Sequence, residues 1–558
     1  MMQDLAKQSR SITSLRDFLE LLGDAGQAIT WSERVMPEPD VRNIAVAASR
    51  DANGAPAIVF DNIAGYPGKR TAVGVHGSWD NIALLLYRPK GTTIRELFFE
   101  IAGRWGDAAA QISTVPEARA PVHECRIESG INLYDVLPVY RINEYDGGFY
   151  LGKASVASRD PEDLDNFGKQ NVGIYRLQLQ GPDSFTLMTI PSHDMGRQIM
   201  AAERTGLPLK IAVMLGNHPG LAVFAATPIG YEESEYSYAS AMMGAPIRLT
   251  KSGNGIDILA DSEIVIEAEM QLGERVLEGP FGEFPGSYSG VRKAPIFKVT
   301  AISHRKNPIF ENIYIYRGWT EHDTLIGLHT SAPIYAQLRQ NFPEVTAVNA
   351  LYQHGLTGII SVKNRMAGFA KTVALRALST PHGVMYLKNL IMVDADVDPF
   401  DLNQVMWALS TRTRADDIIV LPNMPAVPID PYRRSRQGSP PDHRRDQLPA
   451  SRSGRRGASG HPSDRAGHRR AEQEDPGHAT GSFAMSKTVC PRCATGGALD
   501  DYQGKEGGKV VWTIHRCPTC CFSWRDSEPA SAIDIGIRSA DFAVDAANLD
   551  RYVKILQQ

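Results

Sequence analysis

One segment of this chain lacks the residues from which a folded core is built, and it divides the sequence in two. Residues 433–484 contain only two large apolar residues, Leu448 and Phe483, among Arg, Ser, Gly, Pro, Ala, Asp and His. Such a segment buries too little apolar surface to offset the entropy lost on ordering the chain. We therefore expect residues 432–484 to be a disordered linker between a large body and a small C-terminal module, residues 485–558.

A second interpretation of this linker is a shift of the reading frame. Residues 442–448, D-H-R-R-D-Q-L, can be written in codons that encode I-I-D-A-T-S when they are shifted by one base, which is an apolar strand followed by a turn. The sequence Met485-Ser486-Lys487 then has the form of the start of a second protein. We favour the frameshift, and a genuine fused linker is the alternative.

The charge of the chain is as uneven as its apolar content. Residues 431–484 hold 11 Arg, no Lys and 6 acidic residues, so the remainder keeps 48 of the 59 basic and 57 of the 63 acidic residues. An acidic body lacks the basic surface that binds phosphates, so we expect no nucleic-acid partner. No run approaches about 18 consecutive apolar residues, and the N-terminus has no apolar signal-peptide core. We therefore expect no membrane partner and a cytoplasmic location.

The length of 558 residues is too great for one hydrophobic core, so we expect an α/β (α+β) multidomain protein. Residues 12–24 have the pattern of a capped amphipathic helix inside an N-terminal α/β domain, residues 1–115. Residues 116–320 are rich in short β-like runs punctuated by Gly and Pro, which predicts a barrel or a sandwich. Residues 321–431 return to a mixed pattern and are assigned to a C-terminal α/β domain.

The cysteines are concentrated in the C-terminal module. Cys490 and Cys493 form one C-x-x-C pair, and Cys517 and Cys520 form a second, which is the spacing of a zinc ribbon. Four protein ligands leave no open coordination position, so we expect structural Zn²⁺. A ribbon this small has little core, so we expect an independently folding module that depends on its metal. Chance cysteines in a loop are the alternative.

Two carboxylates frame a Gly/Pro turn in the segment E-G-P-F-G-E, residues 278–283. The turn permits a fold-back that directs Glu278 and Glu283 into one pocket, where one of them can hold a proton near neutral pH as a general acid. Arg176 offers a planar, bidentate guanidinium for a carboxylate or phosphate. Without further context, an exposed acidic turn and a surface arginine explain the same residues.

A second group of polar residues has the ligand types of a divalent metal site. Asn171 belongs to the strand pattern Q-N-V-G-I-Y-R, His193 lies in I-P-S-H-D, and Glu235 lies in E-E-S-E-Y. Imidazole and carboxylate groups bind hard or borderline divalent cations. Each residue is uninformative by itself, and a structural role for His193 is the alternative.

Longer motifs give the chain a family resemblance. Residues 10–430 resemble the UbiD-family prenyl-flavin decarboxylases, in particular the C component of the bacterial non-oxidative hydroxyarylic acid (phenolic acid) decarboxylases. The resemblance rests on N-F-G-K-Q-N-V-G-I-Y-R, S-E-Y, E-G-P-F-G-E-F, N-P-I-F-E and V-D-P-F-D-L-N-Q-V-M-W-A-L-S-T-R. Residues 485–531, with C-P-R-C, C-P-T-C and F-S-W-R-D-S-E-P, resemble the small D component of the same enzyme system. The C component normally continues with an I-D-A-T-type segment, whose loss from residues 432–484 bears on C-terminal packing and dimer contacts.

The resemblance implies a cofactor and its site. It implies that the central domain is a split β-barrel that binds prenylated FMN. It also implies a manganese-type divalent ion, with K⁺ as a second candidate ion, held by Asn171, His193 and Glu235. The residues expected to line the flavin or approach its phosphate are Ile174, Tyr175, Arg176, Ile190, His193 and Lys388. A flavin prenyltransferase would supply the cofactor, and a homo-oligomer is expected.

The resemblance also implies the chemistry. Arg176, Glu278 and Glu283 would form the catalytic group, with Glu283 as the proton donor. Loss of CO₂ from an arene needs an electron sink that no side chain provides, which is the task of the cofactor. We therefore predict reversible, non-oxidative decarboxylation of a para-hydroxylated benzoate such as 4-hydroxybenzoate, vanillate or protocatechuate. Two alternatives remain: the polyprenyl-4-hydroxybenzoate decarboxylase of quinone biosynthesis, and a non-catalytic zinc-ribbon adaptor.

Overall fold

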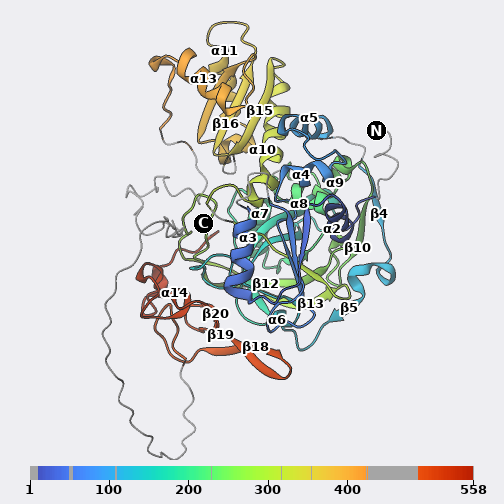
Figure 1. The fold of residues 1–558 in the computed structure, drawn as a ribbon, viewed down its shortest axis with the longest axis vertical. Coiled ribbons are helices and arrows are strands. Elements are labelled where there is room, and N and C mark those ends of the chain that lie inside the picture. Colours follow the sequence, from blue (N-terminus) through green and yellow to red (C-terminus); the bar gives the residue numbers. More distant parts are fainter. Residues whose placement is uncertain are drawn as a thin grey trace, which may run out of the picture.

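The elements of the computed structural model fall into four units along the chain (Figure 1). The described residues are 11–49, 55–106, 110–227, 229–315, 317–352, 355–422, 424 and 488–556. The expected linker, including its proposed frameshift, lies outside them. None of the helices in the described ranges has the length and apolar character needed to cross a membrane.

The N-terminal unit is a mixed sheet with helices packed against it. Its strand order is β1-β2-β3-β14. The strands are β1 (Ala28–Trp31), β2 (Ala57–Phe60), β3 (Arg70–Val73) and β14 (Ile309–Glu311), and the helices are α2 (Leu15–Asp24), α3 (Arg42–Ser49), α4 (Trp79–Leu85) and α5 (Ile94–Arg104). Helix α2 begins as its sequence predicts, because Ser14 accepts a hydrogen bond from the N–H of Asp17 and the apolar face is buried. β14 lies far along the chain from the other three strands. The sheet therefore includes a strand from outside residues 1–115, the range expected for the N-terminal domain.

The central unit is a barrel, which decides between the two sequence-based alternatives. Its strand order is β12-β9-β6-β7-β8-β13, and β12 pairs with β13 to close it, with every pair antiparallel within the described residues. Its strands are β6 (Tyr150–Arg159), β7 (Gln170–Leu179), β8 (Ser184–Leu187), β9 (Lys210–Leu215), β12 (Ile264–Glu278) and β13 (Arg292–His304). Closure leaves no exposed strand edge.

Smaller elements cover the barrel. β5 (Cys125–Ile127) extends β13, and a second sheet has the order β11-β10-β4. Its strands are β4 (Ile112–Thr114), β10 (Ile247–Lys251) and β11 (Asp257–Leu259), and the helices of this unit are α6 (Leu133–Val136), α7 (Asp194–Thr205), α8 (Pro219–Ala225) and α9 (Glu235–Met243). Strand β6 is buried along almost its whole length, which explains why its sequence does not alternate.

The C-terminal α/β unit stands at one end of the long axis of the molecule (Figure 1). Helix α10 (Glu321–Arg339) leads into it from the body, and its sheet has the order β15-β16-β17. Its other elements are β15 (Val345–Tyr352), β16 (Thr357–Val362), β17 (Asn389–Asp394), α11 (Phe369–Leu378), α12 (Pro381–Tyr386) and α13 (Leu402–Arg412). The mixed α/β pattern predicted for this part of the chain is present.

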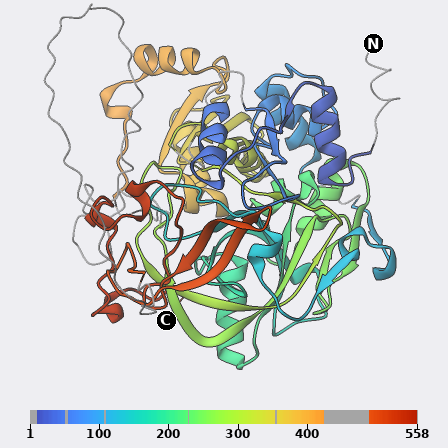
Figure 2. The ribbon, with the colours of Figure 1, turned by 60° about the horizontal axis from the view of Figure 1, so that its bottom comes forward.

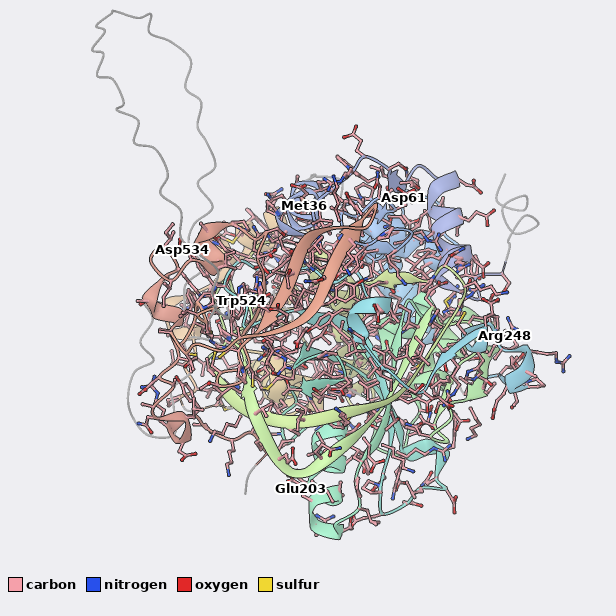
Figure 3. The ribbon with its side chains drawn as sticks, turned by 90° about the horizontal axis from the view of Figure 1, so that it is seen from below. Met36, Asp61, Glu203, Arg248, Trp524 and Asp534 are labelled. Carbon is pink, nitrogen blue, oxygen red and sulfur yellow. The ribbon has the colours of Figure 1, made fainter. Side chains whose placement is uncertain are left out.

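The cysteine module is a three-stranded sheet that lies against the body (Figure 2). Its elements are β18 (Leu499–Glu506), β19 (Lys509–Arg516), β20 (Ser523–Arg525) and α14 (Ala530–Ile533). The far end of its hairpin reaches the part of the N-terminal unit that contains Asp61 (Figure 3), where Glu506 accepts a hydrogen bond from the N–H of Gly65 over 3.1 Å. The module is therefore packed on the other units.

Buried side chains join the module to the body, which the expectation of an independent module did not include. Trp512 is buried and donates its Nε1 hydrogen to the carbonyl of Ala64 over 2.9 Å. Arg525 forms a buried ion pair with Glu38 of the N-terminal unit. Burying a charged pair requires well-defined partners on both sides, so the sequence of the module is adapted to this interface.

Substitution of Gly65 tests this interface. A Cβ at Gly65 would lie 2.5 Å from the indole of Trp512, so Gly65→Ala should displace the module and lower the stability by about 1–3 kcal/mol. Gly68→Ala is the matched control, because Gly68 has a similar positive φ (71° against 76°) and no atom within 4 Å of its Cβ position. Thermal unfolding measures the difference, and equal losses in the two variants would contradict the packing argument.

Candidate functional site

One arginine and two glutamates meet at the end of the barrel. Arg176 lies on β7, Glu278 is the last residue of β12, and Glu283 follows in the turn. The Nε and Nη2 of Arg176 each donate to one oxygen of Glu278 over 2.9 Å, which is a bidentate pair. The Nη1 of Arg176 donates to Oε1 of Glu283. The structure thus brings together the three residues expected to form the catalytic group, and all three are buried or nearly so.

The turn that carries the two carboxylates is held by several hydrogen bonds. The N–H of Gly279, which has a φ of +89°, donates to Oε1 of Gln178 over 2.9 Å. The hydroxyl of Tyr150 donates to the same oxygen over 3.0 Å. At the other end of the turn, the N–H of Glu283 donates to the carbonyl of Ser287 over 2.9 Å. The backbone on either side of the carboxylates is therefore fixed.

The charges of this group favour one retained proton. Burial raises the pKa of Glu283, and the charge of Arg176 opposes that shift without cancelling it. Burial alone would lower the pKa of Arg176. The pKa of this guanidinium is nevertheless raised, because the charges of Glu278 and Glu283 face it. One cation cannot neutralise two buried carboxylates. Glu278 receives two hydrogen bonds from this guanidinium, and Glu283 receives one.

The residues expected to bind the divalent ion lie around the start of β7. Oε2 of Glu235 accepts the N–H of Val172, the neighbour of Asn171, over 3.0 Å. The ring of His193 lies 6.1 Å from that of Tyr175, centroid to centroid. Burial lowers the pKa of His193 to about 4, so its imidazole is neutral at pH 7, the form that binds a metal.

Glu235 provides a test of whether a cation fits here. It is 4% exposed, and none of the Lys or Arg side chains in the described residues forms an ion pair with it. Burial first, and then the negative charges of Asp194 and Glu233, raise its pKa well above the ordinary value. A bound divalent ion would supply the missing positive charge. The amide oxygen of Asn171, the imidazole of His193 and the carboxylate of Glu235 are ligand types that suit such an ion.

The residues expected to line the flavin come from two units. Ile174 and Tyr175 lie on β7, and Ile190 precedes α7 by a few residues. Lys388 lies in the C-terminal α/β unit between α12 and β17, where its N–H donates to the carbonyl of Leu356 over 3.0 Å. A ligand that touches all of them must lie between the barrel and the C-terminal unit.

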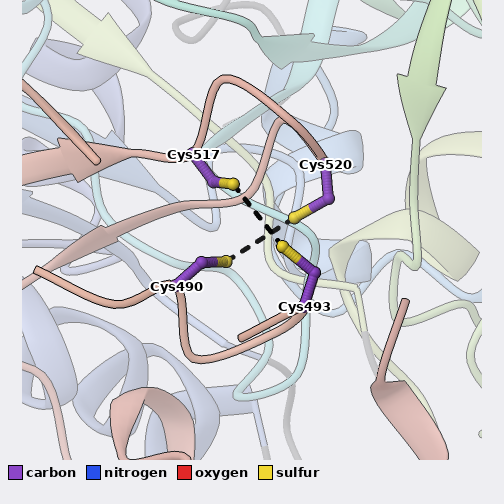
Figure 4. Close-up of side chains that lie close together, drawn as sticks. All are labelled: Cys490, Cys493, Cys517 and Cys520. Atoms are coloured by element: carbon purple, nitrogen blue, oxygen red, sulfur yellow. Dashed lines mark hydrogen bonds between the residues drawn. The ribbon is translucent and has the colours of Figure 1, made fainter. Parts of the chain in front are cut away.

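The four cysteines of the module form one cluster (Figure 4). Their Sγ atoms all lie within 4.8 Å of one another, with Cys490–Cys520 and Cys493–Cys517 separations of 3.6 Å. Tetrahedral Zn–S bonds of about 2.3 Å place neighbouring sulfurs about 3.8 Å apart, so the cluster fits zinc. The separations are too long for disulfides, whose S–S distance is about 2.05 Å.

Several residues near the turn of residues 278–283 were not predicted from the sequence. Phe281 lies over Arg176, with the guanidinium carbon 5.2 Å from the ring centroid. Gln178 could have been found, because it is two residues from Arg176 and shares its face of the strand. Asp146, which accepts the N–H of Gly282 over 2.8 Å, had no such signal. Neither had Arg492, whose Nη2 donates to the carbonyl of Gly279 over 2.7 Å.

Family models match most of the described chain. Residues 19–101, 113–318 and 323–443 match the N-terminal, Rift-related and C-terminal domains of 3-octaprenyl-4-hydroxybenzoate carboxy-lyase, the UbiD family. Residues 485–536 match the EcdD/BsdD phenolic detoxification family. The second match agrees with the expected resemblance of the C-terminal region to the small D component.

The relatives in sequence include phenolic acid decarboxylases. The chain is 48% identical over 419 residues to a phenolic acid decarboxylase of Bacillus subtilis, covering 75% of this chain and 88% of that protein. It is 46% identical over 421 residues to a phenolic acid decarboxylase of Sedimentibacter hydroxybenzoicus, with the same coverage.

Among solved structures, the closed form of the vanillic acid decarboxylase of Sedimentibacter hydroxybenzoicus superimposes with a TM-score of 0.74 and 42% identity, covering 82% of this chain and 97% of that one. HmfF of Pelotomaculum thermopropionicum in complex with prenylated FMN gives a TM-score of 0.66 at 28% identity, covering 76% of this chain and 97% of that one. The expected family and the expected carboxy-lyase class are confirmed. The chain belongs to the UbiD family of decarboxylases, and it carries a domain of the EcdD/BsdD family at its C-terminal end.

Proposed function

We propose that this carboxy-lyase catalyses the reversible, non-oxidative decarboxylation of a para-hydroxylated benzoate, of the 4-hydroxybenzoate, vanillate or protocatechuate type. The observation that carries the proposal is the buried group of Arg176, Glu278 and Glu283 at the end of the barrel. The names of the relatives support the substrate class, since they include phenolic acid, vanillic acid and 3,4-dihydroxybenzoic acid decarboxylases.

The contacts of Arg176 support different roles for the two oxygens of Glu283. Arg176 binds both oxygens of Glu278 through two hydrogen bonds and occupies Oε1 of Glu283 with a third. Oε2 of Glu283 is then the atom that carries the proton and delivers it to the ring carbon as CO₂ leaves. Phe281 covers the guanidinium and keeps water from it. Prenylated FMN, when bound, supplies the electron sink that no side chain provides.

We assign the cofactor site to residues of three elements. Glu235, Asn171 and His193 would hold a manganese-type divalent ion, which would supply positive charge for the flavin phosphate, with K⁺ as a second candidate ion. Ile174, Tyr175, Arg176, Ile190 and Lys388 would contact the prenylated FMN. The unmatched, buried carboxylate of Glu235 is the feature that supports this assignment.

Replacement of Glu235 by alanine should remove the divalent ion and the prenylated FMN together, because one carboxylate joins both to the protein. Metal analysis and the flavin absorption spectrum after dialysis measure the loss. Glu232→Ala is the control, since the side chain of Glu232 is 73% exposed and only three residues away. Stoichiometric flavin and metal in the dialysed Glu235→Ala protein would show that Glu235 is not a ligand.

A substrate screen tests the proposed function. The full chain is expressed with a flavin prenyltransferase, and CO₂ release is measured from 4-hydroxybenzoate, vanillate, protocatechuate and unsubstituted benzoate. Turnover of the hydroxylated acids without turnover of benzoate supports the proposal. Turnover of a polyprenyl-4-hydroxybenzoate alone would favour the quinone-biosynthesis enzyme, and a chain that binds no flavin would favour the zinc-ribbon adaptor.

We also propose that the enzyme is a homo-oligomer in the cytoplasm. Within the described residues, exposed large apolar side chains gather in the C-terminal α/β unit: Met366, Leu375, Leu402, Met406, Trp407, Ile418, Ile419, Val420, Leu421 and Met424. Apolar surface of this extent is typical of a covered interface. An evolved form of the relative HmfF is a dimer, which is compatible with a second copy of the chain as the partner. Light scattering of the purified protein gives the number of copies in the assembly.

A further inference from the structure

The cysteine module reaches the catalytic turn through one residue. Arg492 lies inside the knuckle C-P-R-C, and it is only 2% exposed. Its backbone N–H donates to Sγ of Cys490 over 3.4 Å, and its Nη2 donates to the carbonyl of Gly279 over 2.7 Å. Gly279 directly follows Glu278. One residue therefore connects a cysteine of the zinc cluster with the peptide next to a carboxylate of the catalytic group.

The carbonyl of Gly279 lies in a confined place. The N–H of Gly147 donates to the carbonyl of Pro280 over 2.7 Å. A Cβ on Gly147 would lie 2.2 Å from the oxygen of Gly279 and 3.3 Å from Nη1 of Arg492. The turn is therefore clamped between the segment around Gly147 and the side chain of Arg492, and neither side leaves room for it to shift.

A second route runs from the module to the same turn through Arg141. The Nε of Arg141 donates to Glu528 over 2.5 Å, and its Nη2 donates to the carbonyl of Ser523 over 2.7 Å. Its Nη1 donates to the carbonyl of Asp146 over 2.5 Å, and the carboxylate of Asp146 accepts the N–H of Gly282 over 2.8 Å. The module therefore also orients Asp146, which holds Gly282, the residue before Glu283.

The surroundings of Arg492 explain why an arginine stands here. Four thiolates around one Zn²⁺ carry a net charge of −2, which a buried cation stabilises. Within the described residues, Nε and Nη1 of Arg492 have no hydrogen-bond partner, so Nη2 makes the directional contact of this side chain. A lysine at this place would keep the charge and one donor, whereas an apolar side chain would lose both.

We propose that Arg492 is a positioning residue for Glu278 and Glu283, so that the zinc ribbon is part of the catalytic apparatus. The inference rests on the proposed function, because it treats these two glutamates as the catalytic carboxylates. The hydrogen bond to Gly279 sets the orientation of the peptide after Glu278, and with it the place of both carboxylates. Misplacement of reacting groups by about 1 Å can lower a rate on the order of 10²-fold.

The test replaces Arg492 in the full chain loaded with prenylated FMN and zinc. Arg492→Met removes the donor and keeps a long side chain at the buried position. We expect kcat to fall on the order of 10–100-fold, with KM changed less than about twofold, because the turn positions groups for the chemical step. Amide hydrogen exchange of residues 279–283 should become faster, while bound zinc and flavin stay at their original stoichiometry. Arg492→Lys should recover part of kcat.

Glu506→Ala is the matched control at the same interface. It removes the ion pair between Glu506 and Arg34, whose Oε2 and Nη2 atoms lie 3.1 Å apart across the interface. This pair lies away from the turn, so kcat and the exchange of residues 279–283 should stay unchanged. Unchanged exchange in Arg492→Met, or an equal loss of kcat in Glu506→Ala, would overturn the proposal. If Arg492→Met is insoluble, Arg492→Leu, which also lacks the donor, is used for the same exchange measurement. If the chain decarboxylates no aromatic acid, the proposed function fails, and hydrogen exchange alone decides whether Arg492 holds the turn.

Discussion

Replacement of Glu283 by glutamine is expected to lower kcat by about 10²–10⁴-fold while prenylated FMN remains bound. The amide has the shape of the carboxyl group and can still accept the hydrogen bond from Nη1 of Arg176 at its oxygen. It cannot transfer a proton to the ring carbon. Glu283 is buried, and that burial raises its pKa. Measurement of CO₂ release at saturating substrate, together with the flavin spectrum, checks both halves of the expectation.

Glu274→Gln is the control for this experiment. Glu274 lies on the same strand, β12, and its side chain is exposed, so the substitution makes the same change of side chain away from the turn of residues 278–283. Its kcat should match that of the unmodified enzyme. A Glu283→Gln protein that binds the cofactor and turns over at the original rate would remove Glu283 from the role of proton donor.

Replacement of Lys153 by methionine is expected to destabilise the protein by about 3–5 kcal/mol, the cost typical of breaking a buried ion pair. The Nζ of Lys153 lies 2.5 Å from a carboxylate oxygen of Glu311 and of Glu321, and 2.9 Å from Nδ1 of His76. All four side chains are buried. His76, Glu311 and Glu321 have the ligand types of a metal site, and the ammonium group of Lys153 takes the place of a cation among them.

This cluster joins three units, so its loss should appear in global unfolding. Lys153 lies on β6 of the barrel, Glu311 on β14 of the N-terminal sheet, and Glu321 at the start of α10. The thermal midpoint of Lys153→Met should fall by at least about 5 °C. Lys210→Met, at an exposed position of β9 in the same barrel, is the control and should leave the midpoint unchanged. Equal midpoints in the two variants would show that the buried cluster contributes nothing.

The same cluster predicts how stability depends on pH. Burial alone would raise the pKa of Glu321, but the charge of Lys153 and the hydrogen bonds from His76 outweigh it and lower the pKa to about 2. A carboxyl group whose pKa is lower in the folded state contributes stability that is complete above its unfolded value, 4.5. That contribution is lost as the pH falls from about 4.5 toward 2. The Lys153→Met protein should lose this acid dependence.

Part of the candidate site could be predicted from local sequence. The spacing of Glu278 and Glu283 across a Gly/Pro turn indicated that the two carboxylates approach one another, and both contact Arg176 in the structure. The resemblance to the UbiD family supplied the choice of Arg176 among many arginines. Nothing local marked Tyr150 as a partner of the turn, because its hydrogen bond with Gly279 depends on which strands lie near the end of β12.

The sequence by itself determined the chemistry that is encoded within short spans. Two C-x-x-C pairs determine a four-cysteine cluster, because each pair directs two thiolates from one tight turn. The apolar pattern of residues 12–24 determines a capped helix, because the side-chain period is a property of the helix alone. These features need no partner elsewhere in the chain.

Only the tertiary structure decided which of these local features contact one another. The pairing of β8 with β13 in the barrel, the addition of β14 to the N-terminal sheet, and the contact of Arg492 with Gly279 all join residues that are distant in sequence. Such contacts depend on complementary shape, buried hydrogen bonds and charge between whole surfaces, and no spacing along the chain encodes them. The cysteine module could therefore be identified from its motif, while its place beside the catalytic turn became visible only in the folded molecule.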